Sequence, residues 1–148
     1  ELSGELPAGA VLTPHPGEMA RLLGQTVSDV QANRVRTAQE AAQRFRAIIV
    51  LKGAFTIVAS PDGRLALAPF ANPALATGGT GDVLAGTIAG LMAQGMPSFE
   101  AACAGTFVHG LAGEAVRAAL GSAGALASDL LPLLPQALRD LRGELVGR

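Results

Sequence analysis

Three glycines and one acid fall within six residues that lead directly into an apolar segment. The sequence TGGTGD covers residues 77–82, and the apolar segment begins at Val83. Glycine lets the backbone turn tightly and come close to a ligand, and the unpaired N–H groups at a helix start attract anions. A carboxylate beside such a nest repels an anion but can take a proton from a group that attacks it. The pattern therefore predicts phosphoryl chemistry with Asp82 as the general base.

A simple tight turn into a helix is the competing interpretation of residues 77–82. Aspartate is a common N-cap residue, so Asp82 also fits an ordinary capped helix. The glycines exceed what a turn requires, which favours an anion-binding nest. The stretch is not a Walker A loop, because no Gly-Lys-Ser/Thr follows it. It is not a dinucleotide fingerprint either, because Leu84 occupies the place of the third glycine.

A lysine follows the most apolar strand predicted in the chain. Residues 47–51 (AIIVL) form a continuous apolar run, which is typical of a strand covered on both faces. Lys52 and Gly53 end this run. Ligands of open α/β sheets lie beyond the carboxyl ends of strands, so Lys52 is placed to meet a phosphate. The alternative is a lysine that lays its stem on apolar surface and keeps its amine in water.

A histidine between two prolines follows the first predicted strand. The sequence TPHPGE covers residues 13–18, and the prolines fix the backbone around His15. Glu18 falls in the first turn of the next helix, where an acid is favourable without any further function. His15 is expected at the same end of the sheet as Lys52, which favours a ligand-binding role. The second histidine, His109, lies in an apolar helical segment and is predicted to be a packing residue.

An α/β fold is expected to position these residues. The apolar runs predict strands at 10–13 and 47–51, and a β-hairpin formed by 55–59 and 64–68. Helices are predicted at 17–23, 28–45, 81–95, 98–120 and 128–142, with a loop over 69–79. This order predicts a mostly parallel sheet flanked by helices, with a helical C-terminus.

The composition narrows the class of protein. A chain of 148 residues is long enough for one domain with a core, and no internal boundary is visible. The net charge of −1 argues against nucleic-acid or anionic-membrane partners. No signal peptide is recognisable, and the longest apolar run, 83–96, is shorter than the roughly 20 residues of a membrane span. One cysteine and two histidines argue against a zinc site, and the single Cys103 favours a cytoplasmic protein.

Three motifs resemble the signatures of one enzyme family. The segments LTPHPGEMARL (12–22), VLKGAFT (50–56) and NPALATGGTGDVLAG (72–86), with HGLAG at 109–113, resemble the ADP/ATP-dependent NAD(P)H-hydrate dehydratases. These are ribokinase-like enzymes that repair nicotinamide cofactors. Related vitamin-precursor kinases, which phosphorylate hydroxyethylthiazole or hydroxymethylpyrimidine, show Pro-Asn-x-x-Glu where this chain has His15. The resemblance therefore implies a ribokinase-like fold and favours a dehydratase over a kinase.

The resemblance also implies a role for each site residue. His15 and Asp82 would contact the hydrated nicotinamide of NADHX or NADPHX. The co-substrate, ADP or ATP, would contact Lys52, Gly53, Ala54, Phe55, Thr56 and Gly81, and Gly79 and Thr80 would complete an anion hole. Glu18 would help to organise Mg²⁺ through water, and no direct metal ligand is predicted.

Family size and assembly give further expectations. Members are roughly twice as long as this chain, a size that still fits one domain. Residues 1–148 are therefore expected to form the C-terminal portion of one dehydratase domain, with a DADALN-like segment before Glu1. The resemblance also implies a homotetramer, fused to or working with an NAD(P)H-hydrate epimerase. Two alternatives stay open: a small-alcohol kinase of the same superfamily, and an inactive fragment that only binds a nucleotide or a partner chain.

Overall fold

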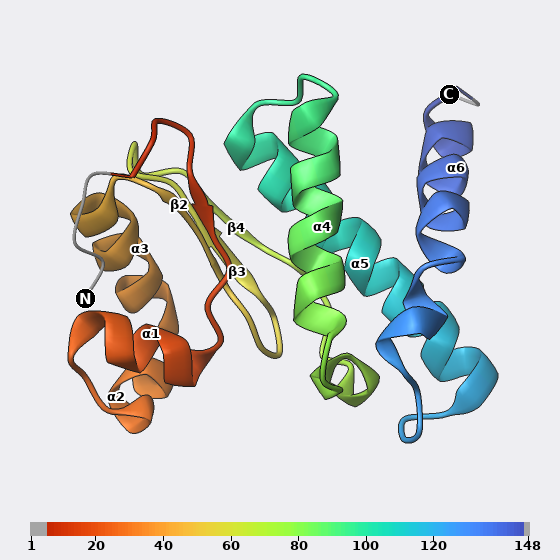
Figure 1. Ribbon diagram of the computed structural model, residues 1–148, viewed down its shortest axis with the longest axis horizontal. Helices are drawn as coiled ribbons and strands as arrows, with labels where there is room; N and C mark the ends of the chain where they lie inside the picture. The colour runs from red at the N-terminus through yellow and green to blue at the C-terminus, as the bar shows by residue number, and fades with distance from the viewer. Residues whose placement is uncertain (1–5, 147–148) are drawn as a thin grey trace.

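A computed structural model describes residues 6–146 of the chain and shows a sheet between two groups of helices (Figure 1). Helices α1 (Pro16–Leu23), α2 (Val27–Ala32) and α3 (Arg34–Phe45) cover one face. Helices α4 (Thr80–Ala93) and α5 (Ser98–Leu120) cover the other, and α6 (Leu133–Val146) packs on α5. The predicted helix over 98–120 is confirmed. Within the described residues, no helix has both the length and the apolar character needed to cross a bilayer.

The sheet contains four strands in the order β1-β2-β3-β4. They are β1 (Val11–Leu12), β2 (Ile48–Leu51), β3 (Ile57–Ala59) and β4 (Leu65–Leu67). Strands β1 and β2 are parallel, whereas β2–β3 and β3–β4 are antiparallel. The hairpin is confirmed, but the prediction of a mostly parallel sheet is wrong for the described strands. Only the β1–β2 connection is long enough to include helices and return in the same direction, and the short later turns must reverse the chain.

The segment predicted as one helix over 28–45 is two helices that meet at Asn33. This residue has φ −134° and ψ 41°, outside the helical region. Helix α2 begins earlier than predicted, because Thr26 caps it through the backbone N–H of Asp29. The break places Arg34 at the first position of α3, beside the end of β2.

Two further segments contain short 3₁₀ turns. The loop predicted over 69–79 holds the turn η1 (Pro73–Ala76), capped by the side chain of Asn72. The helix predicted at 128–142 is divided into the turn η2 (Ala127–Leu130) and helix α6. Pro132 lies between them, and its missing N–H prevents a continuous helix.

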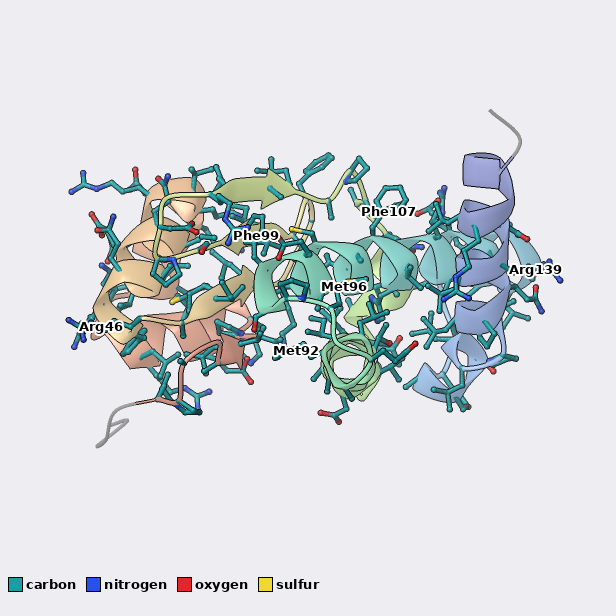
Figure 2. The ribbon with its side chains drawn as sticks, turned by 90° about the horizontal axis from the view of Figure 1, so that it is seen from above. Arg46, Met92, Met96, Phe99, Phe107 and Arg139 are labelled. Atoms are coloured by element: carbon teal, nitrogen blue, oxygen red, sulfur yellow. The ribbon has the colours of Figure 1, made fainter. Side chains whose placement is uncertain are left out.

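Each face of β2 packs against a different hydrophobic cluster, as its apolar sequence predicted. Ile49 and Leu51 face α1–α3, whereas Ile48 and Val50 face α4 and α5. Figure 2 shows Met92, Met96 and Phe99, which extend the second cluster where α4 ends and α5 begins. A Cβ atom on Gly105 would lie only 2.7 Å from Cγ1 of Ile88, so this glycine allows α4 and α5 to pack closely. The packing fixes the start of α4 opposite the carboxyl ends of β1 and β2.

Candidate active site

The three sequence motifs meet in one cavity of about 470 Å³. Its lining includes His15 after β1, Lys52 and Gly53 after β2, and residues 75–82 around the start of α4. His15 and Lys52 lie at the same end of the sheet, as predicted, and the start of α4 lies beside them. The structure brings His15, Lys52 and Asp82 to the same place.

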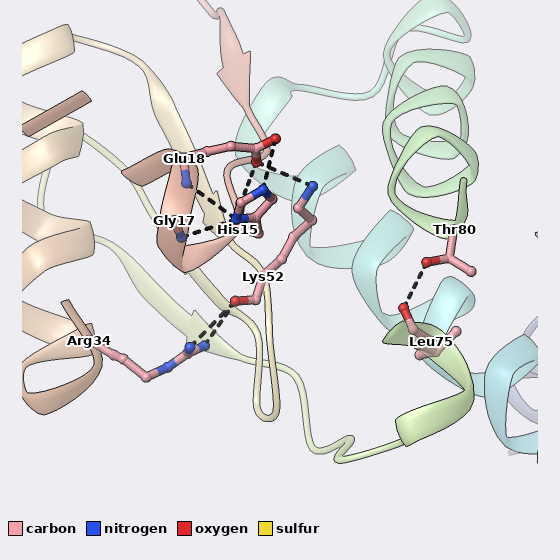
Figure 3. Close-up of polar contacts among 7 residues, drawn as sticks. All are labelled: His15, Gly17, Glu18, Arg34, Lys52, Leu75 and Thr80. Atoms are coloured by element: carbon pink, nitrogen blue, oxygen red, sulfur yellow. Dashed lines mark hydrogen bonds and ion pairs between the residues drawn. The ribbon is translucent and has the colours of Figure 1, made fainter. Parts of the chain in front are cut away.

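The glycine turn before α4 is held by a buried threonine. Gly79 has φ +87°, a left-handed conformation that favours glycine, and it is the N-cap of α4. The hydroxyl oxygen of Thr80 lies 2.7 Å from the carbonyl oxygen of Leu75 and 2.8 Å from that of Thr77, so its single proton is donated to these backbone acceptors; Figure 3 shows the contact with Leu75. The side chain of Thr80 thus shapes the turn, and its hydroxyl is not directed at an anion. Any contribution of Thr80 to the anion hole is through this shaping.

Backbone N–H groups at the start of α4 are available for an anion. The N–H groups of Asp82 and Val83 donate to the carbonyl of Gly79, at 3.1 and 3.2 Å. Within residues 6–146, no hydrogen-bond partner is found for the N–H groups of Gly78, Gly79 and Gly81. Such unpaired donors, at the positive end of the helix dipole, suit a phosphate group.

Asp82 occupies the third position of α4, and its carboxylate does not cap the helix. The N-cap is Gly79, and no side chain forms a cap hydrogen bond. The interpretation of Asp82 as an ordinary N-cap is therefore wrong. Its exposed side chain lines the cavity and forms no ion pair within the described part of the chain. The carboxylate can accept a proton from a bound ligand.

The ammonium of Lys52 lies over the first turn of α4. A Cβ atom on Gly81 would be 3.0 Å from Nζ of Lys52, so the glycine makes room for the ammonium. Nζ is also 3.6 Å from Oε2 of Glu18. The backbone N–H of Lys52 donates to the carbonyl of Pro14, which ties the end of β2 to the end of β1. The geometry directs the lysine charge at the glycine turn rather than into open water.

His15 and Glu18 form a reciprocal cap at the start of α1 (Figure 3). Nδ1 of His15 accepts hydrogen bonds from the N–H groups of Gly17 (3.0 Å) and Glu18 (3.2 Å). Oε2 of Glu18 accepts one from the N–H of His15 at 2.6 Å, and its Oε1 lies 3.3 Å from Nε2 of the ring. A ring nitrogen that accepts two N–H groups carries no proton, so the hydrogen of the neutral ring is on Nε2. Sequence reasoning missed this cap, although the His-x-x-Glu spacing matches a capping box.

Glu18 also connects His15 to Lys52. Partial burial by itself raises the pKa of Glu18, but the hydrogen bond from the His15 backbone and the charge of Lys52 outweigh it. The pKa of Glu18 is therefore below its ordinary value of 4.5. Its oxygens are engaged by protein groups, and in the described residues no three His, Cys, Asp or Glu side chains gather to hold a metal. A Mg²⁺ ion at this site would need most of its ligands from phosphates and water.

A second cavity of about 330 Å³ adjoins the first and shares Lys52, Gly53 and Gly81 with it. Its lining also includes Ala54, Thr56 and, from α5, Thr106 and His109. The segment assigned to the nucleotide by resemblance thus lines this cavity, except for Phe55. That residue has φ +53° and an exposed ring, and it lines neither cavity. A contact between Phe55 and the nucleotide stays a prediction, as do the other ligand contacts.

His109 packs in the interior, as predicted, but it also has a polar partner. Its Nε2 lies 2.9 Å from the carbonyl oxygen of Thr80, and because a carbonyl accepts, the ring donates. Burial lowers the pKa of His109 below 6.5, although the bond to Thr80 opposes this shift. The neutral ring therefore connects α5 to the first residue of α4.

Comparison with known proteins identifies the family. The family model described as NAD(P)H-hydrate dehydratase matches residues 4–136. The chain belongs to the NAD(P)H-hydrate dehydratase family. It is 48% identical over 134 residues to a bifunctional NAD(P)H-hydrate repair enzyme Nnr of Moorella thermoacetica, covering 90% of this chain and 25% of the relative. It is 50% identical over 123 residues to an ADP-dependent (S)-NAD(P)H-hydrate dehydratase of Neisseria meningitidis, covering 82% of this chain and 42% of the relative.

Solved structures that are similar to this chain show the same fold. The ADP/ATP-dependent NAD(P)H-hydrate dehydratase of Bacillus subtilis, co-crystallised with ATP and Mg²⁺, is 38% identical with a TM-score of 0.84. The match covers 89% of this chain and 48% of that one. A ribokinase-like superfamily protein of Enterococcus faecalis is 29% identical with a TM-score of 0.74, over 90% of this chain and 45% of that one. The ribokinase-like α/β fold is confirmed, and the chain spans half or less of these proteins.

Proposed function

We propose that this protein dehydrates the hydrated forms of NADH and NADPH and couples the reaction to hydrolysis of ADP or ATP. The observation that carries the proposal is the free carboxylate of Asp82 beside the unpaired N–H groups of the glycine turn and the ammonium of Lys52. Family membership supports the same activity, since the relative from Neisseria meningitidis is an ADP-dependent dehydratase.

The arrangement suits a reaction in which a poor leaving group is first phosphorylated. Asp82 takes the proton of the substrate hydroxyl while the hydroxyl oxygen attacks the terminal phosphorus and the bond from phosphorus to the rest of the nucleotide breaks. The glycine N–H groups and Lys52 stabilise the negative charge of the transferring phosphoryl group. The lone pair of the ring nitrogen then expels phosphate, and loss of a proton from the neighbouring ring carbon restores the dihydronicotinamide.

Magnesium enters this proposal as part of the nucleotide. The phosphates and water would supply most ligands, because Glu18 is engaged by His15 and Lys52. The Bacillus subtilis enzyme co-crystallised with ATP and Mg²⁺ supports a magnesium–nucleotide complex as the true co-substrate. The substrate role of His15 would use the imidazole edge that the cap leaves exposed.

The proposal extends to the context of the chain. Coverage of 42% and 48% of the dehydratases from Neisseria meningitidis and Bacillus subtilis supports residues 1–148 as the C-terminal portion of one dehydratase domain. The bifunctional relatives support an epimerase that is fused to this activity or works with it. A homotetramer and a cytoplasmic location complete the proposal; both follow from the resemblance and the composition.

The function is tested by adding NADH hydrate, Mg²⁺ and either ADP or ATP to the purified protein. We expect the absorbance of the reduced nicotinamide to return. An Asp82→Asn variant should lose 10²-fold to 10⁴-fold in kcat, the usual contribution of a positioned base, while it still binds ADP. Near wild-type turnover by Asp82→Asn would disprove the role of Asp82.

Two other results would support the alternative functions. Phosphorylation of hydroxyethylthiazole or hydroxymethylpyrimidine without any return of absorbance would indicate a small-alcohol kinase. ADP binding in a thermal-shift titration, with neither reaction, would indicate a fragment that only binds nucleotide.

A further inference from the structure

A half-buried arginine lies directly behind the turn that carries Lys52. Arg34, the first residue of α3, donates from Nη2 to the carbonyl oxygens of Leu51 (3.3 Å) and Lys52 (3.5 Å). Its Nη1 lies 3.4 Å from the same Lys52 oxygen and 3.1 Å from Oε1 of Gln31. Figure 3 shows the guanidinium and the ammonium of Lys52 on opposite sides of this turn. The arginine thus binds the backbone from which the lysine projects.

The local helix gives no reason for a cation at this position. The N-terminus of a helix is the positive end of its dipole, where a positive side chain is unfavourable. Asn33 offers no side-chain cap, and among residues 6–143 no carboxylate forms an ion pair with Arg34. Burial lowers the pKa of Arg34, which reflects the cost of removing the charge from water. Its partners are neutral oxygens, and the two carbonyls belong to the end of β2.

The turn is built around this contact. Gly53 has φ +135°, and a Cβ atom there would lie 2.8 Å from Nη1 of Arg34. The missing side chain is therefore what lets the guanidinium lie against the backbone. On the other side of the turn, the hydroxyl of Thr56 donates to the carbonyl of Gly53 at 2.9 Å. Phe55 adds a second left-handed residue at φ +53°, so the turn is strained and needs fixing from outside.

We propose that Arg34 is a positioning residue for nucleotide binding: it holds the Lys52–Gly53 turn so that the lysine ammonium faces the phosphate site. The proposal rests on the function proposed above. The held turn keeps Nζ of Lys52 over Gly81 and within 3.6 Å of Glu18. Loss of Arg34 should therefore weaken the nucleotide and spare the nicotinamide substrate.

The test compares Arg34→Met, Arg34→Lys and the control Arg36→Met. Arg36 is on the same helix, is exposed and pairs with Glu40, away from the site. For each variant, calorimetry gives the Kd of ADP, and kinetics give the KM values of ADP and NADH hydrate. We expect Arg34→Met to raise the Kd and KM of ADP at least tenfold and to change the KM of NADH hydrate less than twofold. Arg34→Lys, which keeps the charge but loses the planar fork, should lie between it and wild type, and Arg36→Met should match wild type.

A purely structural role for Arg34 predicts a different result. Arg34→Met would then melt at a lower temperature but bind ADP within twofold of wild type, and this result would overturn the proposal. Equal increases in both KM values would also overturn it. If Arg34→Met does not fold, Arg34→Lys decides: an unchanged Kd of ADP disproves the proposal, and a raised one supports it. The wild-type protein separates this inference from the proposed function. If wild type is active and Arg34→Met binds ADP normally, only the inference is refuted. If wild type neither binds ADP nor dehydrates NADH hydrate, the proposed function is refuted as well.

Discussion

The carboxylate of Glu18 joins two residues that are assigned to different ligands. One oxygen accepts from the backbone of His15 and approaches Lys52, and the other approaches the His15 ring. His15 is proposed to contact the nicotinamide and Lys52 the nucleotide, so Glu18 fixes their relative positions. At the scale of residues, one carboxylate therefore sets the spacing between the two proposed ligand contacts.

Gly81 is the residue whose substitution tests the position of Lys52. In Gly81→Ala, the new Cβ would lie 3.0 Å from Nζ, so the ammonium must move. Because Nζ is the end of a flexible chain, the fold should accommodate the methyl group with little change in stability. We expect ADP to bind about tenfold more weakly, roughly the cost of 1.4 kcal/mol in binding free energy. Gly86→Ala, with no atom near its added Cβ on the same helix, is the control. Equal ADP affinity of Gly81→Ala and Gly86→Ala would show that ADP binding does not depend on the position of the Lys52 ammonium over Gly81.

The sequence predicted which residues lie in the site better than it predicted the hydrogen bonds that hold them there. Asp82, Lys52 and His15 could be selected because glycines, prolines and strand ends mark them in the chain. The cap formed by His15 was missed because propensities for N-caps favour hydroxyl, carboxylate and amide side chains over imidazole. Arg34 was missed because its partners are backbone carbonyls far along the chain, which no sequence spacing indicates.

At the scale of elements, the start of α4 is held by contacts from segments that precede and follow it in the sequence. Lys52 after β2 approaches it from one side, and His109 of α5 donates to the carbonyl of Thr80 from the other. The turn η1 holds the hydroxyl of Thr80 through Leu75. Contacts from the end of β2, from α5 and from η1 therefore determine together where α4 begins.

The contact between α5 and α4 predicts a dependence of stability on pH. The pKa of His109 is lowered in the folded protein by burial, whereas the unfolded chain binds a proton near pH 6.5. As the pH falls below 6.5, the unfolded state takes up a proton that the folded state resists, so the free energy of unfolding decreases. The decrease levels off below the lowered pKa of the folded state, and well above pH 6.5 this group contributes no slope.

Urea unfolding at pH 7.5 and 5.5 measures this contribution. His109→Gln keeps an N–H donor for Thr80 but does not titrate, so its free energy of unfolding should fall less between the two values than that of wild type. The same fall in both proteins would mean that other groups cause the pH dependence and that His109 plays no part in it.

The ends of the helices were harder to predict than the presence of helices and strands. The apolar pattern continues across Asn33, so residues 28–45 were predicted as one helix. The capping pair Thr26 and Asp29 in fact marks the start of α2, and the pair is visible in the sequence. Strand β2 was predicted correctly because a short apolar run rich in β-branched residues is typical of a buried strand.

At the scale of the whole molecule, the site lies where the two groups of helices face each other across one end of the sheet (Figure 1). His15 and Glu18 cap the start of α1, and the start of α4 carries the proposed anion hole. The mixed sheet was not predictable from periodicity, because alternation reveals which residues are buried but not the direction of neighbouring strands. The convergence of three motifs could be predicted, because carboxyl ends of strands gather ligands in α/β folds.

In the proposed reaction, Asp82 takes the proton of the substrate hydroxyl while the hydroxyl oxygen attacks the terminal phosphoryl group, and this oxygen then leaves the ring as part of phosphate. Hydration of NADH in ¹⁸O-labelled water places the label in that hydroxyl. After turnover with ADP and Mg²⁺ in unlabelled water, mass spectrometry of the products locates the label. We expect the released inorganic phosphate to carry the ¹⁸O, since the hydroxyl oxygen is bonded to phosphorus before its bond to the ring carbon breaks. Label found in water, with unlabelled phosphate, would disprove phosphorylation of the hydroxyl before its departure.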